Sequence, residues 1–159
     1  MDIVVDYARP NELERVNELR NMVREIHATA RTDMFHKAGN EEFVKQVVAE
    51  YNSEDFDILV AKVDDVICGF AVVECFNKPA SLYRMARQIY KIVDLGVDEK
   101  YRRNGIATKL IDTICKDAID KGFCRVELEM WEFNNDAIAF FEKTGFFTFR
   151  RFMEMKLSK

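Results

Sequence analysis

The chain has 159 residues, of which 48% are hydrophobic and 33% charged, and its formal net charge is −4 at pH 7. This length suits a single domain over residues 1–159, and the composition is that of a folded globular protein rather than a disordered one. The negative balance argues against nucleic acid as a partner, because neutralising phosphates needs a clustered positive surface.

The sequence shows no sign of a membrane span or of secretion. No apolar run is long enough to cross a bilayer, and the opening MDIVVDYARP lacks the basic and apolar regions of a signal peptide. The four cysteines form no CxxC pair, and the two histidines have no ligand-like spacing with them. We therefore expect reduced core thiols in a cytoplasmic protein, with no membrane partner and no metal site.

The first half of the chain predicts a strand, two helices and a β-hairpin. Asn11 and Glu14 have the spacing of a capping box at the start of the first helix. In chain order the predicted elements are a strand at 2–8, a helix from Asn11 to about Ala28, a loop at 31–40, a helix at 41–51, and paired strands at 56–63 and 66–76.

The second half adds strands and two helices, each helix ended by a glycine. Residues 78–88 contain Pro79 and have no clear period, so they are expected to be a connection of undecided structure. The remaining predictions are a strand at 89–97, a helix from Ile106 to Gly122, a strand at 124–130, a helix at 135–145, and one or two closing strands at 146–157. This order, β-α-α-β-β-β-α-β-α-β(β), indicates an α/β (mixed α+β) domain with a mixed sheet covered by helices.

The loop YRRNGIATKL, residues 101–110, has two interpretations. The first N–H groups of a helix have no internal partner and lie at the positive end of the helix dipole. A glycine turn at Gly105 could aim them at a phosphate. Arg102 and Arg103 could add charged contacts, and Ala107 is small. The other interpretation is a solvated basic loop before an ordinary helix. The P-loop and dinucleotide motifs fit poorly, because the lysine and the further glycines that they need are missing.

Two segments together resemble the GNAT superfamily of N-acetyltransferases. VDLGVDEKYRRNGIATKLI is similar to its acetyl-CoA-binding segment, whose Arg/Gln-x-x-Gly-x-Gly/Ala signature is met by Arg102, Gly105 and Ala107. NNDAIAFFEKTGF is similar to its second landmark, matching at Asn134, Ala137, Phe140, Glu142, Lys143, Gly145 and Phe146. The resemblance implies a single GNAT-like domain with a central, mostly antiparallel, twisted sheet flanked by helices.

The resemblance also implies the activity and the cofactor site. Family members transfer the acetyl group of acetyl-CoA to an amine, usually by direct attack within a ternary complex. The N–H groups of 103–108 would hold the CoA pyrophosphate, and the N–H of Leu95 would polarise the acetyl carbonyl. The implied cofactor contacts are Leu95, Gly96, Val97, Arg102, Arg103, Asn104, Gly105, Ile106, Ala107, Thr108, Asn134, Ala137, Phe140 and Phe141.

One position departs from the family pattern. A tyrosine that serves as general acid for the departing thiolate is replaced here by Phe141, which has no proton to donate. A thiolate with a pKa of about 8.5 is a tolerable leaving group, so this change need not abolish turnover. Water or a tyrosine could substitute, and the tyrosines considered, each also explicable as structural, are Tyr83, Tyr90 and Tyr101.

The acceptor amine must lose a proton before it attacks. Asp94 is the first candidate for the base and Glu74 the second, although a surface or ion-paired carboxylate is the simpler explanation of each taken singly. His27, Asp33 and Tyr83 lie in the segments that select the acceptor in this family, but His27 could merely be solvated and Asp33 could cap a loop. The acceptor itself, a small amine, an antibiotic or a protein amine, is not specified by these segments.

The leading hypothesis is a cytoplasmic acetyl-CoA-dependent N-acetyltransferase, and small proteins of this fold often form homodimers. A competing hypothesis is a non-catalytic module that binds and senses acyl-CoA, and Phe141 is the residue that keeps it open.

Overall fold

The computed structural model describes residues 1–37 and 41–158, in which five strands form one sheet in the order β1-β2-β3-β4-β5. The first four strands pair antiparallel, and β5 pairs parallel to β4. The strands are β1 (Val4–Tyr7), β2 (Phe56–Val63), β3 (Val66–Lys78), β4 (Arg87–Val97) and β5 (Val126–Leu128). The predicted fold class, a mostly antiparallel sheet flanked by helices, is confirmed.

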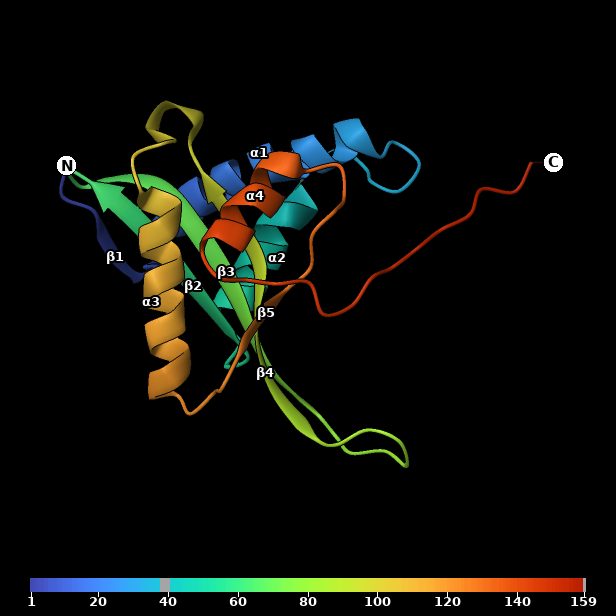
Figure 1. Cartoon of the computed structure of the whole chain (residues 1–159). Helices are drawn as coiled ribbons and strands as arrows, with labels where there is room; N and C mark the ends of the chain where they lie inside the picture. The colour runs from blue at the N-terminus through green and yellow to red at the C-terminus, as the bar shows by residue number, and fades with distance from the viewer. Residues whose placement is uncertain (38–40, 159) are drawn as a thin grey trace. The chain divides into compact units, whose positions relative to one another are not determined.

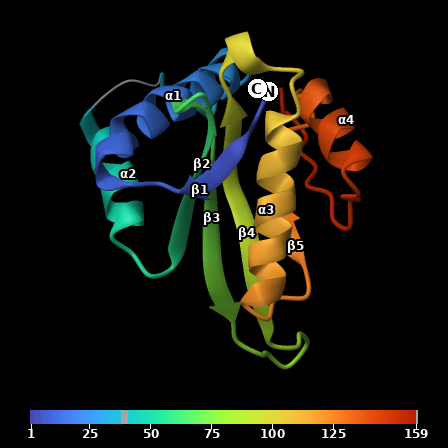
Figure 2. The same cartoon turned by 90° about the vertical axis from the view of Figure 1, so that its left-hand side faces the viewer.

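Helices cover both faces of this sheet (Figures 1 and 2). α1 (Leu13–Ala30) packs on β3 and β4, and α2 (Glu41–Tyr51) packs on β2 and α1. α3 (Ile106–Asp120) lies on the opposite face, against β2, β3 and β4. Two short 3-10 turns, η1 (Pro10–Glu12) and η2 (Glu99–Tyr101), precede α1 and follow β4. No helix in the described residues is both long and apolar enough to span a membrane.

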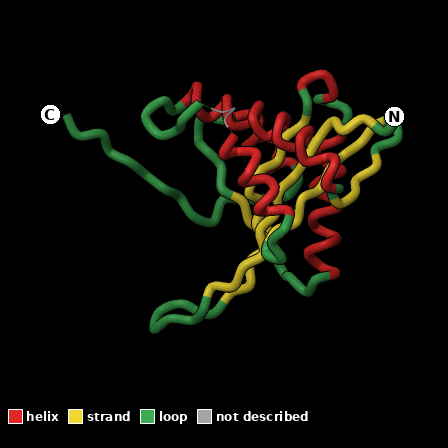
Figure 3. Tube along the Cα trace, turned by 180° about the vertical axis from the view of Figure 1, so that it is seen from behind, coloured by secondary structure: helices red, strands yellow, loops and turns green. Residues whose placement is uncertain are grey.

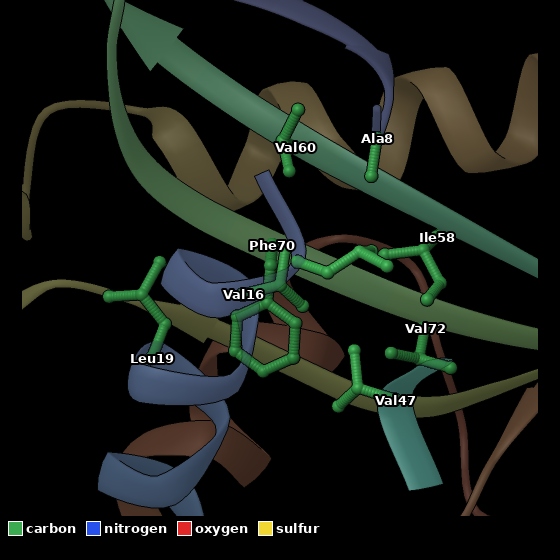
Figure 4. Packing of buried hydrophobic residues seen from close by; sticks show 9 residues of the cluster. Ala8, Val16, Leu19, Val47, Ile58, Val60, Phe70 and Val72 are labelled. Carbon is green, nitrogen blue, oxygen red and sulfur yellow. The ribbon is translucent and has the colours of Figure 1, made fainter. Parts of the chain in front are cut away.

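The core on the α1 and α2 face is apolar and closely packed. Figure 4 shows Phe70 and Val72 of β3 directed toward Val16 and Leu19 of α1 and Val47 of α2. Each of these side chains is almost completely buried. The apolar residues that alternate along β3 therefore pack against the apolar faces of α1 and α2, as the sequence pattern predicted.

The start of the first helix differs from the prediction. Pro10 is the first residue of the 3-10 turn, and the Arg9 N–H donates to Glu12 Oε2 at 2.7 Å. Glu12, and not Glu14, therefore accepts the hydrogen bond from the N–H group that precedes the turn. Glu12 Oε1 also pairs with Lys62 Nζ of β2 at 2.5 Å. The expected capping box of Asn11 and Glu14 is absent because this tertiary ion pair fixes Glu12 instead.

The β3–β4 hairpin is longer than expected, and β5 is shorter. β3 continues to Lys78 and β4 begins at Arg87, so only residues 79–86 connect them, at the tip of an extended arm (Figure 3). The pairing of Asn77 with Gln88 and of Lys78 with Arg87 extends the ladder through residues with no apolar period. The predicted strand at 124–130 contracts to Val126–Leu128.

The chain from Met130 onward forms a second compact unit, which is described by itself. It contains α4 (Asn135–Lys143), whose cap Asn134 accepts from the Ala137 N–H at 3.3 Å. Phe141 is buried against the rings of Phe140 and Phe146. The single-domain expectation for residues 1–159 stays a prediction.

The prediction of closing strands at 146–157 is wrong, because this segment has no regular secondary structure. A strand needs a neighbouring strand for its N–H and C=O groups, and the described part of this unit contains none. The apolar side chains of the segment are instead exposed, among them Phe147, Phe152 and Met153.

The four cysteines are free. Burial raises the pKa of the Cys68, Cys75 and Cys115 thiols, which agrees with the expected core positions. Cys124, in contrast, is exposed. Within the described residues no cluster of three or more His, Cys, Asp or Glu side chains could hold a metal ion.

Two glycines let helices approach the sheet closely from opposite faces. A Cβ at Gly69 would lie 2.9 Å from Ile106 Cγ2, where α3 begins. A Cβ at Gly96 would lie 2.7 Å from Phe70 Cε1 and 2.8 Å from Val23 Cγ2 of α1. The end of β4 is therefore enclosed between both helix layers, which positions the loop that follows it.

Gly96→Ala should lower the free energy of unfolding by about 1–3 kcal/mol, because the added methyl group overlaps Phe70 and Val23. Chemical denaturation measures this loss. Adding Phe70→Leu should restore part of it by removing the ring edge, whereas strictly additive losses would show that the ring contact is not the cause.

Candidate cofactor and acceptor site

The loop between β4 and α3 is a preformed turn. Asn104 Nδ2 donates to the carbonyl oxygens of Tyr101 and Arg102, each at 3.1 Å. Arg103 and Gly105 both have left-handed backbone, with φ of 64° and 83°. Such alternation turns successive N–H groups toward one point, a geometry that binds anions.

The backbone N–H groups of residues 103–108, called here the loop amides, are without acceptors. None of these six groups donates to an atom of residues 1–37 or 41–158, and the first turn bond of α3 is Lys109 N–H to Gly105 O at 3.0 Å. A Cβ at Gly105 would meet no heavy atom within 4 Å, so the space beside the turn is open. With the positive end of the helix dipole, unpartnered N–H groups of this kind suit an anion, so the geometry is compatible with the predicted phosphate contact.

The two arginines of the loop differ. Arg102 is tied back to the strand, with Nε donating to Val97 O at 3.2 Å and Nη1 lying 3.6 Å from Glu99 Oε1. Arg103 is exposed and holds its left-handed backbone at a cost of about 1 kcal/mol or more. The expected phosphate contact therefore fits Arg103 and the loop amides better than it fits Arg102, whose guanidinium braces the loop.

The outer edge of β4 is unpaired beside this loop. β4 and β5 pair only where Tyr90–Ile92 meets Val126–Leu128, and β4 continues for five residues beyond. The Asp98 N–H donates to Cys68 O of β3 at 2.8 Å, so by alternation the Leu95 and Val97 main-chain groups face away from β3. Leu95 and Val97 thus direct main-chain groups away from β3, with Val97 O accepting from Arg102 Nε, whereas the Gly96 main chain faces β3. Contact of Leu95 and Val97 with a cofactor stays a prediction.

A bulge in β4 lies at the point where β5 leaves. Val72 pairs with Asp94 and Val73 pairs with Ile92, which leaves Val93 as an extra residue in β4. A bulge bends its strand and re-aims the side chains that follow it. Asp94 is the first residue after this bulge and directly precedes Leu95.

Asp94 is held by a buried arginine that the sequence analysis did not single out. Arg20 Nε donates to Asp94 Oδ2 at 2.6 Å, and the same guanidinium pairs with Glu50 of α2. The Arg20 side chain is 2% exposed, that of Glu50 9% and that of Asp94 19%. Burial lowers the pKa of Arg20, but Glu50 and Asp94 together raise it by more than burial lowers it. The net shift is therefore upward, and the guanidinium is charged.

The signal for Arg20 was available in the sequence. It occupies the apolar stripe of α1, one turn after Val16 and three residues before Val23. Charged side chains are rarely buried without a partner, so an arginine at such a position predicts buried carboxylates nearby. Their identity was not predictable, because Glu50 and Asp94 are 30 and 74 residues away in the chain.

His27 lies near Asp94 in the last turn of α1. Burial lowers the pKa of its imidazole and the charge of Asp94 raises it, with a net downward shift. Its ring stacks on Phe35, with centroids 5.5 Å apart. His27 is therefore a half-buried group with a neutral ring at pH 7, and not the freely solvated helix-end histidine of the simpler interpretation.

The other predicted site residues lie elsewhere. Asp33 pairs with Arg31 at 2.8–2.9 Å. Glu74 is half-buried on β3, two residues from Val72, the register partner of Asp94. Tyr83 is exposed at the tip of the β3–β4 arm, beyond Arg87 and at the opposite end of β4 from Asp94. Asn134, Ala137, Phe140 and Phe141 belong to the second unit.

An open hollow of about 750 Å³ lies along α1. Its walls include Met22 and the carboxylates of Glu18, Glu25 and Glu99, and none of the predicted site residues lines it. The hollow is adjacent to the 3-10 turn that leads into the loop, so it shares that end of β4 with the loop amides.

Comparison with known proteins agrees with this geometry. Residues 4–146 match the model of the Acetyltransferase (GNAT) family. The L-ornithine N5-acetyltransferase NATA1 of Arabidopsis thaliana is 32% identical over 97 residues, 61% of this chain and 41% of that protein. The chain therefore spans less than half the length of this relative.

Solved structures show the same fold over the whole chain. A single-site mutant of the BH1408 protein of Bacillus halodurans superposes with a TM-score of 0.90 at 25% identity, covering 98% of this chain and 99% of that one. The aminoglycoside N-acetyltransferase AAC(6')-Iy, solved with CoA, gives 0.78 at 15% identity, with coverage of 98% and 95%. With the family model matching residues 4–146, the chain belongs to the GNAT family of acetyltransferases.

Proposed function

We propose that this protein is an acetyl-CoA-dependent N-acetyltransferase that passes the acetyl group to a primary amine by direct attack in a ternary complex. The observation that carries the proposal is the set of unpartnered loop amides beside the free edge of β4. Family membership and the CoA-bound structure of AAC(6')-Iy support it.

The residues present fit CoA as the ligand. The loop amides suit a pyrophosphate, because they offer several donors at a helix N-terminus without a protein acceptor. The main-chain groups of Leu95 and Val97 suit the amides of an extended pantetheine arm, as an edge strand accepts a peptide. The Leu95 N–H would donate a hydrogen bond to the acetyl carbonyl and polarise it.

Asp94 is the proposed group that faces the acceptor amine. Its Oδ2 is occupied by Arg20, and Oδ1 has no hydrogen-bond donor among the residues that the structure describes. An ammonium has no lone pair, so it must lose a proton before attack, and Asp94 accepts that proton directly or through water. A positive partner weakens a carboxylate as a base, so binding and orienting the amine is a second part of this role.

The absence of a tyrosine at Phe141 keeps a second function in view, an acyl-CoA sensor without transfer. Phe141 is buried between two other phenylalanine rings, so it serves the packing of α4. Tyr90 does not replace the missing hydroxyl, because it is buried, donates to Asp57 Oδ2 at 3.1 Å and has its pKa raised by burial. Turnover distinguishes the two functions.

The acceptor class is proposed from the substrates of the relatives. They include an enzyme for L-ornithine and one for aminoglycosides, and both substrates are small-molecule amines. We propose a small-molecule amine, with a protein amine as the other possibility. A cytoplasmic location and a homodimer remain predictions.

Acetyl-CoA should bind the native chain in the micromolar range, and Gly105→Glu should abolish that binding. The new carboxylate would stand beside the loop amides and repel the pyrophosphate, while also straining a left-handed position. Isothermal titration calorimetry measures both affinities.

Gly122→Glu is the matched control for this titration. Gly122 has φ of 84°, and a Cβ there would also have no neighbour within 4 Å, but it follows the other end of α3. It should lose a similar amount of stability and retain acetyl-CoA affinity. Absence of binding to the native chain would refute the proposed function.

An amine panel separates the transferase from the sensor. L-ornithine, an aminoglycoside and a lysine-containing peptide are incubated with acetyl-CoA and the protein, and free thiol is measured over time. We expect thiol release at a catalytic rate with at least one amine. Binding of acetyl-CoA without release above the uncatalysed rate for any of them would favour the sensor.

Asp94→Asn should slow transfer by about a hundredfold, and most strongly at low pH. At high pH a larger share of the acceptor is already the free amine, so the need for a protein base falls there. The measurement is kcat/KM against pH for both proteins. A loss that is equal at every pH would remove Asp94 from the role of base.

A further inference from the structure

We propose that Arg20 is a positioning residue for transfer, acting through Asp94. It fixes Oδ2 of that carboxylate, so that Oδ1 is the oxygen presented to the acceptor. The inference rests on the proposed function, because it takes Asp94 as the group that faces the amine. It assigns a role to a residue of α1 that binds neither substrate.

The geometry of the cluster fixes the guanidinium on three elements at once. Arg20 projects from α1, bonds Asp94 of β4 through Nε at 2.6 Å, and pairs with Glu50 of α2 through its two terminal nitrogens. Gln46 of α2 in turn donates to Glu50 Oε1 at 2.8 Å. Since both ends of the bridge are held, the Asp94 side chain has one anchored oxygen and little rotational freedom.

A purely structural role explains this cluster poorly. Burying a guanidinium with two carboxylates brings little net stability over apolar side chains of similar volume. The position of Arg20 between Val16 and Val23 is one that an apolar residue would fill. The carboxylate that it anchors directly precedes Leu95, whose N–H faces the free edge of β4.

Several charged groups act on Asp94. From α1 these are Arg20, Arg24 and His27, and from α2 the charge of Glu50 acts on the same guanidinium. Arg20 is the one among them that donates a hydrogen bond to Asp94. Removing Arg20 and Glu50 together therefore frees Asp94 Oδ2 without leaving a buried, unpaired carboxylate on α2.

The test is a double-mutant cycle on kcat/KM with acetyl-CoA and the amine of the panel that the native chain turns over fastest. Arg20→Lys keeps the charge but loses the fixed planar fork, and should lower kcat/KM about tenfold. In the Asp94→Asn background the same change should alter kcat/KM by less than about threefold, because the group that it positions is gone. Acetyl-CoA affinity should remain within about threefold of native in every variant.

A second variant removes the ion pair without leaving Glu50 buried and unpaired. Arg20→Met/Glu50→Leu should lower kcat about tenfold and leave the KM for acetyl-CoA within about threefold of native, and in the Asp94→Asn background it should change kcat by less than about threefold. Arg15→Lys is the matched control. Arg15 of α1 pairs with Asp98, the residue after β4, at 2.6 Å, and its replacement should lower kcat by less than about threefold.

The outcomes separate this inference from the proposed function. No thiol release by the native chain would refute the proposed function and the inference with it. Release by the native chain with losses that add to that of Asp94→Asn, either for Arg20→Lys or for the double variant, would refute the inference alone. Non-additive losses that fall on kcat and leave acetyl-CoA affinity unchanged would support it.

Discussion

The separation of β5 from β4 after Ile92 is the constraint on which the site depends. A sheet normally satisfies both edges of an inner strand, and here the last five residues of β4 pair with β3 as their one neighbouring strand, while Val97 O accepts from Arg102 Nε. The Leu95 main-chain groups therefore face no strand, and the bulge at Val93 turns β4 where the pairing with β5 stops. The same strand then leads directly into the loop amides. One continuous stretch of backbone therefore offers first the main-chain groups of a strand edge and then the N–H groups of a helix start.

The two faces of β4 divide the chemistry between them. Gly69 admits the start of α3 on one face, and Gly96 admits α1 on the other, so both helices approach the strand end closely. The α3 side carries the unpartnered backbone N–H groups, and the α1 side carries Asp94, anchored by Arg20. In the proposed function, the anionic acetyl donor and the cationic acceptor would therefore lie on opposite sides of one strand.

The features of the candidate site that the sequence indicated depend on local signals. The glycine turn and the helix after it were recognisable because Gly105 and that helix are consecutive in the chain, and Leu95 and Val97 came from the family resemblance of the same segment. The Arg20 cluster was not found because it joins residues from three elements. The capping box was wrong for a related reason, since Lys62, fifty residues further along, determines which glutamate the turn uses. The expected closing strands show a different limit: alternating apolar residues at 146–157 favour a strand, but pattern alone does not supply the partner edge that a strand needs.

In the proposed function, main-chain recognition of the acetyl donor leaves the side chains free to define the acceptor. The loop amides and the edge of β4 would bind through N–H and C=O groups, so most side-chain substitutions there would leave the binding groups in place, except at a left-handed position such as Gly105. Recognition of the amine, in contrast, would use Asp94 and its partner Arg20 on α1. A fold built in this way can retain one donor while its acceptor changes with a few side chains of α1, which is consistent with a family that includes enzymes for both ornithine and aminoglycosides. In this chain Arg20 limits which substitutions α1 can accept, because replacing it would also remove the hydrogen bond that holds Asp94 Oδ2.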